Sequence, residues 1–262
     1  MRFQLPNGML DGSDHFNFVV VDELTGEQQD YLADKDLVIG NIGHIPKIIT
    51  DLVKSIETKE GLQWKGDRTQ LCYLLTATDL ESILIKIREE TFGPEFFHIA
   101  VCEKCQHEHK NLKLDLSKLK IEHISIKDLL DPNKRTIKLP KSEQEAELKP
   151  LYLRDLFEIL KVTQNSSNKL ITSLSALSVK RLGDKSPVTR DDIKKLSARD
   201  ISFLNKTVEE LTEASLKSTK LKLEGTIDTY SEFECTKCKA ENKLKLNVFD
   251  PDFFDPSKAT AT

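Results

Sequence analysis

The chain has 262 residues, enough for one large or two ordinary domains, and its hydrophobic content of 38% supports a core. Its 39 basic and 43 acidic residues leave a formal net charge of −4, so no strong global field calls for a polyanion or a membrane surface. The longest apolar run, FVVV from Phe18, is the size of a strand and far below the roughly 18 to 20 residues of a membrane span.

The first part of the chain predicts an extended start followed by helices. Leu5-Pro6 heads the extended segment, and Leu24-Thr25 precedes a helix-like stretch that reaches Leu32. Pro46 occupies a first-turn position of a second helix. Apolar residues recur there at helical spacing and predict one continuous stripe: Ile45, Ile48, Ile49, Leu52, Val53 and Ile56.

A third helix has explicit start and stop signals. Thr78 followed by Glu81 matches a capping box, and Gly93-Pro94 ends the helix. Its expected buried face consists of Leu80, Ile83, Leu84 and Ile87. Just before it, Cys72 lies in the apolar run QLCYLL, where we expect a buried small hydrophobic residue and not a metal ligand.

Two CxxC pairs follow in neighbourhoods of similar sequence, AVCEKCQHEHKNLKLDL and FECTKCKAENKLKLNVF. In each, an extended lead reaches the first cysteine, two residues turn the chain, and a strand leaves. Such a turn lets two sulfurs reach one ion, and four thiolates complete the tetrahedron of a closed structural zinc site. We therefore predict one structural zinc per chain, with these ligands: Cys102, Cys105, Cys235 and Cys238.

Three alternatives for these cysteines fit less well. Disulfides suit oxidising compartments, but the sequence shows no signal peptide and has five cysteines. A redox CxxC would normally open a helix, whereas strand-like KLKLDL and KLKLNV follow here. His107 or His109 could replace a sulfur, but the second copy has no histidine at the matching place.

The cysteine motifs belong to a longer internal match. Leu5-Pro6 matches Leu139-Pro140, and Asp79 matches Asp200. The segment ITDLVKSI from Ile49 matches ITSLSALS from Ile171. We predict an α+β fold of internally duplicated helical units, each ending in a β-hairpin zinc knuckle, with the two knuckles joined as a split zinc ribbon. The first unit would span residues 1–130 and the second residues 131–262, related by a pseudo-twofold axis through the metal.

The second unit begins at a charged stretch, Asp131–Lys149, which we interpret as the join between the copies. Ser197 or Asp200 caps its main helix, whose predicted apolar face is Ile201, Leu204, Val208 and Leu211. The C-terminal segment concentrates three aromatic residues, Phe249, Phe253 and Phe254. They either fold back as a plug over the core or form a docking peptide.

No catalytic motif stands out. The chain has no GxxxxGK[ST], GxGxxG, GxSxG or HExxH, and a zinc closed by four sulfurs keeps no open position, so we expect no enzyme. Nucleic-acid binding by a zinc ribbon is the alternative function. Lysines do crowd the hairpins, namely Lys104, Lys110, Lys113, Lys237, Lys239, Lys243 and Lys245. Glutamates lie between these lysines and reduce the positive potential of the hairpins, namely Glu103, Glu108, Glu234 and Glu241.

The ordered combination of these features resembles the base-plate hub assembly proteins of T4-like contractile-tailed phages. The features are the LP-headed start, an LTxxxxxxL helix, a capped helix ending in FG before a CxxC hairpin, a second CxxC hairpin and an FDPxFF terminus. The resemblance covers most of the chain and carries the four cysteines over as metal ligands, with no catalytic residues to transfer.

This resemblance implies a non-enzymatic component or assembly factor (chaperone) of the base-plate hub. The expected partners are other tail proteins, such as the hub and tape-measure proteins, with no membrane and no nucleic acid. We expect the protein in the host cytoplasm during assembly and in the tail base plate of the virion. Self-association into an oligomer is compatible with this role.

Overall fold

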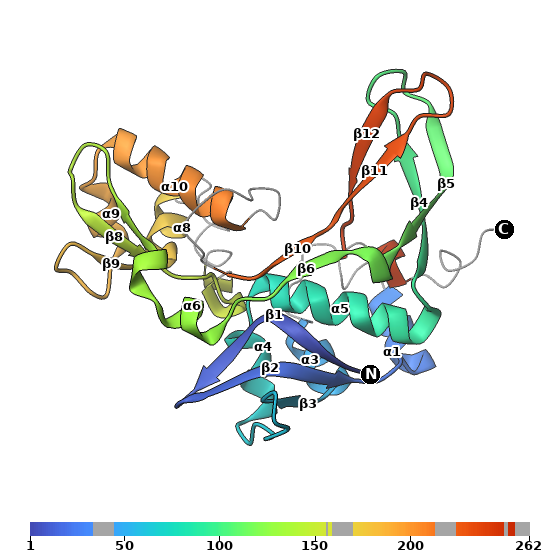
Figure 1. Cartoon of the computed structure of the whole chain (residues 1–262), viewed down its shortest axis with the longest axis horizontal. Coiled ribbons are helices and arrows are strands. Elements are labelled where there is room, and N and C mark those ends of the chain that lie inside the picture. Colours follow the sequence, from blue (N-terminus) through green and yellow to red (C-terminus); the bar gives the residue numbers. More distant parts are fainter. Residues whose placement is uncertain (34–44, 156, 159–169, 213–223, 249–250, 255–262) are drawn as a thin grey trace.

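The computed structural model describes residues 1–33, 45–155, 157–158, 170–212, 224–248 and 251–254. It mixes helices and strands, which confirms the α+β class. Figure 1 shows two bodies of helices and strands and an arm of paired hairpins that rises beside the first body. Across the described ranges, no helix is long and apolar enough to cross a membrane.

The first body contains a three-stranded antiparallel sheet in the order β1-β2-β3. Its strands are β1 (Arg2–Asp11), β2 (Asp14–Val21) and β3 (Val53–Glu57). β1 pairs with β2 at both ends, and residues 5–8 form a wide bulge between the paired stretches, which contains the predicted Leu5-Pro6 segment. Helix α1 (Gly26–Ala33) begins directly after Leu24-Thr25, as predicted.

The predicted helix from Ile45 to Ile56 is wrong in its last four residues. Helix α3 (Ile45–Leu52) ends at Leu52, and the chain continues directly into β3. Val53 and Ile56 are buried, but they reach the core from a strand that pairs with β2. Both are β-branched, and the partner strand β2 favours the extended conformation over a further helical turn.

The third predicted helix exists but begins earlier than expected. After the 3-10 turn η2 (Arg68–Gln70) and the short helix α4 (Leu71–Leu74), helix α5 (Ala77–Phe92) starts from Thr76. The capping box therefore pairs Thr76 with Asp79, and the prediction of Thr78 and Glu81 is wrong. Gly93 ends the helix with a positive φ of 82°, as the Gly-Pro signal predicted.

The Asp79 carboxylate explains this start. Besides capping α5, it accepts hydrogen bonds from the backbone N–H of Asn7 at 2.8 Å and of Gly8 at 3.2 Å, which ties α5 to the β1 bulge. A tertiary contact thus selects one of two overlapping capping patterns.

Two hairpins form the arm (Figure 1). The first consists of β4 (Glu95–Val101) and β5 (Glu108–Asp115), and the second of β11 (Tyr230–Glu234) and β12 (Glu241–Lys245). Near the base of the arm, the 3-10 turn η3 (Leu116–Lys118) leads to β6 (Lys120–Glu122). This strand pairs antiparallel with β10 (Thr226–Asp228). The arm is therefore built from segments of both halves of the sequence.

The second body has a sheet in the order β7-β8-β9, covered by short helices. Its elements are α6 (Ile126–Leu130), η4 (Pro132–Lys134), β7 (Thr136–Lys138), β8 (Glu145–Leu148), α8 (Leu170–Ser178), β9 (Val179–Leu182), α9 (Arg190–Lys194) and α10 (Ala198–Thr212). Ser197 caps α10 by accepting from the Asp200 N–H, as predicted. On its predicted face, Leu204 and Val208 are buried, whereas the Leu211 side chain lies outside the described residues.

The stretch Asp131–Lys149, which we interpreted as the join, also contributes β7 and β8 to the second sheet, and α6 and η4 lead into it. Polar and apolar residues alternate along both strands, although Glu147 is buried as well as Ala146 and Leu148.

Each body has its own hydrophobic cluster, and the cluster of the first body includes the described C-terminal residues Phe253 and Phe254. Phe253 and Phe254, in the 3-10 turn η6 (Pro251–Phe254), are buried there beside α5. For these two residues the plug interpretation is confirmed, and Phe249 lies outside the described residues. Cys72 is also buried in this cluster, as predicted.

Candidate metal centre

The four cysteines of the two CxxC motifs meet at the tip of the arm. Cys102 Sγ lies 3.6 Å from Cys238 Sγ, and Cys105 Sγ lies 3.7 Å from Cys235 Sγ. All four sulfurs lie within 4.8 Å of one another. Each short contact joins one cysteine from each hairpin, so sulfurs from distant parts of the sequence line a single site.

These distances fit a metal ion and not a disulfide. A disulfide requires sulfurs about 2.05 Å apart, and all five cysteines are free. Zn–S bonds of about 2.3 Å give a regular tetrahedron with edges of about 3.8 Å, close to the two sulfur contacts above. The donor set of four sulfurs therefore has the size and chemistry of a structural zinc site.

The two knuckles share one backbone geometry. In the first, the N–H of Cys102 donates to the carbonyl of His107, and the N–H of Gln106 donates to the carbonyl of Cys102, both at 2.9 Å. In the second, Cys235 N–H donates to the Ala240 carbonyl at 2.8 Å, and Lys239 N–H donates to the Cys235 carbonyl at 2.9 Å.

The residue after the second cysteine adopts the left-handed conformation in both knuckles. Gln106 has a φ of 57° and Lys239 a φ of 60°. Non-glycine residues rarely adopt this conformation, so its repetition at matching positions marks the same tight turn in both motifs.

Backbone N–H groups inside the knuckles point at the sulfurs. Those of Cys105 and Lys104 lower the pKa of the Cys102 thiol to about 6. In the second knuckle, the N–H of Ala240 donates to the Cys238 sulfur. The facing sulfurs also lower the pKa of Cys102, but burial and the facing sulfurs raise the pKa of Cys238 to about 12, so only part of the cluster favours the thiolate, which is the form that binds a metal.

Contacts just behind the cysteines hold the hairpins together. The buried Asn242 side chain accepts from the backbone N–H of Glu103 at 3.0 Å and donates to the carbonyl of Ala240 at 2.8 Å. His109, at the matching position of the first hairpin, stacks on Phe233 with ring centroids 5.2 Å apart. Sequence reasoning considered His109 only as a possible ligand and gave Asn242 no role; the alternation along each strand indicates that both side chains point inward, but not which groups they contact.

The metal-ligand cluster found among the described residues contains cysteines alone. His107 stacks against His109, 4.9 Å between ring centroids, and neither belongs to the cluster. Of the scattered histidines, His15 bonds to the Asn7 carbonyl and His123 to the Leu5 carbonyl, whereas His44 lies outside the described residues.

Two lysines of the second hairpin are paired with glutamates. Lys239 lies 3.2 Å from Glu234, and Lys243 lies 3.3 Å from Glu232. These ion pairs offset part of the positive charge of the hairpin.

The family model described as T4 bacteriophage base plate protein matches residues 23–255. The chain belongs to this family. No curated protein and no solved structure matches it. The matched range contains all four cysteines and the buried phenylalanines, so both the arm and the C-terminal plug belong to the part that the family model describes. The predicted resemblance to T4-like phages is confirmed at the level of the base plate.

Proposed function

We propose that this base-plate protein is a non-enzymatic component or assembly factor (chaperone) of the base-plate hub. It acts through contacts with other tail proteins, such as the hub and tape-measure proteins, in the host cytoplasm during assembly and in the virion tail. The observation that carries this proposal is the family match over residues 23–255 together with a sulfur site closed by four cysteines. Such a site leaves no open position for a substrate.

The metal in this proposal is one structural zinc per chain, bound by Cys102, Cys105, Cys235 and Cys238. Zinc is the usual ion for four thiolates in a tetrahedral structural site. Its place at the tip of two hairpins, each with a small apolar face, indicates that it fixes the arm as one rigid element. The arm can then present a defined surface to a partner.

The proposal includes an internal duplication, with units at residues 1–130 and 131–262 and their knuckles joined as a split zinc ribbon. A matching pair of contacts supports it. As Asp79 accepts from Asn7 and Gly8, Asp200 accepts from the backbone N–H of Lys141 at 2.8 Å and of Ser142 at 3.2 Å. These residues follow the two Leu-Pro pairs at the same spacing.

The two bodies also share a junction at which a helix passes directly into a strand, but its position differs from the sequence match of Ile49 with Ile171. α3 passes into β3 at Val53-Lys54, and α8 passes into β9 at Val179-Lys180. The pairing of Ile49 with Ile171 is therefore out of step by about one helical turn. Nucleic-acid binding, the alternative function, gains no specific observation, because Lys239 and Lys243 of the second hairpin are paired with glutamates.

Co-expression of the tagged chain with the hub and tape-measure proteins tests the proposed function. We expect a stable complex that survives washing at high salt, since apolar contacts resist screening. Purified tails then separate a component, which remains in them, from a released assembly factor. Failure to retain any tail protein, combined with binding to nucleic acid that weakens steeply with salt, would replace this proposal with the alternative.

A further inference from the structure

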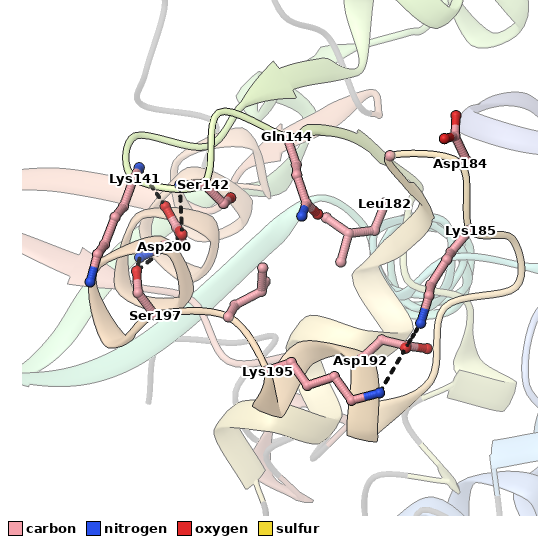
Figure 2. Close-up of a pocket in the computed structure, with 12 residues that line it drawn as sticks. Lys141, Ser142, Gln144, Leu182, Asp184, Lys185, Asp192, Lys195, Ser197 and Asp200 are labelled. Atoms are coloured by element: carbon pink, nitrogen blue, oxygen red, sulfur yellow. Dashed lines mark hydrogen bonds and ion pairs between the residues drawn. The ribbon is translucent and has the colours of Figure 1, made fainter.

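A hollow of about 830 Å³ lies in the second body, beyond the turn that joins β7 to β8. Figure 2 shows this hollow ringed by the turn, by the segment after β9, and by α9 and the start of α10. Gln144 and Leu182 point into it from above. Its volume lies within the range of sites that hold a ligand or a peptide segment.

The first body shows what fills the corresponding space. The β1 bulge, residues 5–8, corresponds to the β7–β8 turn, because each donates two backbone hydrogen bonds to the aspartate at the start of a helix, Asp79 or Asp200. Beyond the bulge, β1 and β2 continue as a hairpin from Met9 to Phe16. The Met9 and Phe16 side chains are only 4% and 5% exposed and belong to the first core.

The second body has no such extension. Its chain turns back at once, because the N–H of Glu143 donates to the carbonyl of Leu139 and the N–H of Leu139 donates to the carbonyl of Gln144. Glu143 adopts a φ of 57° to close this turn. The hollow therefore lies where the first body places its own hairpin.

The lining indicates the chemistry of an occupant. Leu182 and Leu196 supply apolar surface, as the first core does. Leu71 and Leu74 lie eight and five residues before Asp79, and at the same spacing before Asp200 the second body has Asp192 and Lys195. Asp192 forms ion pairs with Lys195 and Lys185. Lys141 adds a further exposed cation at the rim. Of the three aspartates in the lining, Asp192 is paired with Lys185 and Lys195, Asp200 accepts from the backbone N–H groups of Lys141 and Ser142, and Asp184 lies on the side away from Lys141 (Figure 2). The hollow therefore suits an occupant that places a carboxylate beside Lys141 and an apolar side chain beside the leucines.

We propose that this hollow binds an extended segment of another base-plate protein, one with an apolar side chain flanked by acidic residues. The segment would complete the second body as the hairpin Met9–Phe16 completes the first. That hairpin, MLDGSDHF, itself has this composition, with apolar ends around two aspartates. The inference rests on the proposed function for the source of the segment and on the geometry for its chemistry.

A synthetic peptide of residues Gly8–Asn17 is the probe, added to the whole labelled chain and followed by NMR. We expect shifts concentrated at Ser142, Gly183 and Leu196. Lys141→Glu should weaken binding about two- to fivefold, because it removes a rim charge. Lys65→Glu, at an exposed lysine of the first body, is the matched control and should leave binding unchanged.

The same peptide in excess should release the tail protein that co-purifies with the chain. No binding at millimolar peptide, equal weakening by both lysine variants, or peptide-sensitive self-association of the chain would each overturn the proposal, the last because the occupant would be a second copy. Peptide binding at the hollow without any co-purifying tail protein would instead refute the proposed function and leave the chemistry of the hollow standing.

Discussion

At the scale of single residues, buried carboxyl groups set the pH response of the fold. Glu224 is buried beside the first turn of α5. Burial, followed by the nearby carboxylates of Asp79 and Glu81, raises the pKa of its carboxyl to about 8, and a hydrogen bond from Thr78 partly opposes this shift. The folded protein therefore keeps a proton between about pH 4.5 and pH 8 that the unfolded chain releases. The free energy of unfolding falls as the pH rises through this window.

Glu224→Gln should remove this pH dependence. We expect near-parental stability at pH 5 and a gain on the order of 2 to 4 kcal/mol at pH 8.5, measured by urea unfolding at both pH values. The exposed Glu60→Gln serves as the control. A gain of equal size at pH 5 and pH 8.5 would show that the effect is not electrostatic.

At the scale of elements, the aspartates that anchor each hairpin to its helix should act alike. Asp79→Ala and Asp200→Ala each leave two backbone N–H groups without their acceptor, at an expected cost of about 1 to 3 kcal/mol. Hydrogen exchange should quicken at Asn7 and Gly8 in the first variant and at Lys141 and Ser142 in the second. Asp184→Ala, at an exposed aspartate, is the control; a large effect from only one anchor would contradict the duplication.

The C-terminal plug gives a second prediction at this scale. The Phe253 ring is fully buried, lies 5.4 Å from the Phe96 ring, and faces the buried guanidinium of Arg88, which donates to the Phe253 carbonyl at 2.8 Å. Phe253→Ala should cost about 3 to 5 kcal/mol in unfolding free energy, because it leaves a cavity beside α5. Leu130→Ala, at an exposed leucine of α6, should cost less than about 0.5 kcal/mol.

The elements also show what a sequence can reveal. Gly93, Ser197 and the CxxC turns were predictable because their signals are local: a stop, a cap and a metal-ligand spacing. The strand after Leu52 and the start of α5 at Thr76 were not, because strand pairing with β2 and the contact from Asn7 and Gly8 to Asp79 decide them. For the same reason the four cysteines were identifiable, whereas Asn242, which clamps the hairpins through a backbone group of Glu103, was not.

At the scale of the whole molecule, the sulfur cluster joins parts of the chain that are 130 residues apart in sequence. Closing so long a loop has a large entropic cost, and a metal bound by the four cysteines would offset it with a folding free energy on the order of 10 kcal/mol or more. A shared site therefore couples the two hairpins in a way that two separate sites would not.

Cys102→Ser and Cys235→Ser should have the same consequence although they lie in different hairpins. Elemental analysis should fall from one zinc per chain to well below one, and hydrogen exchange should quicken in β4–β5 and β11–β12 alike, because neither hairpin keeps its partner without the ion. Cys72→Ala is the matched control: it removes a buried thiol outside the cluster and should retain the zinc. Exchange confined to the mutated hairpin would mean that each CxxC pair finds other ligands. The arm would then be two independent hairpins, and the common metal would no longer explain why they lie together.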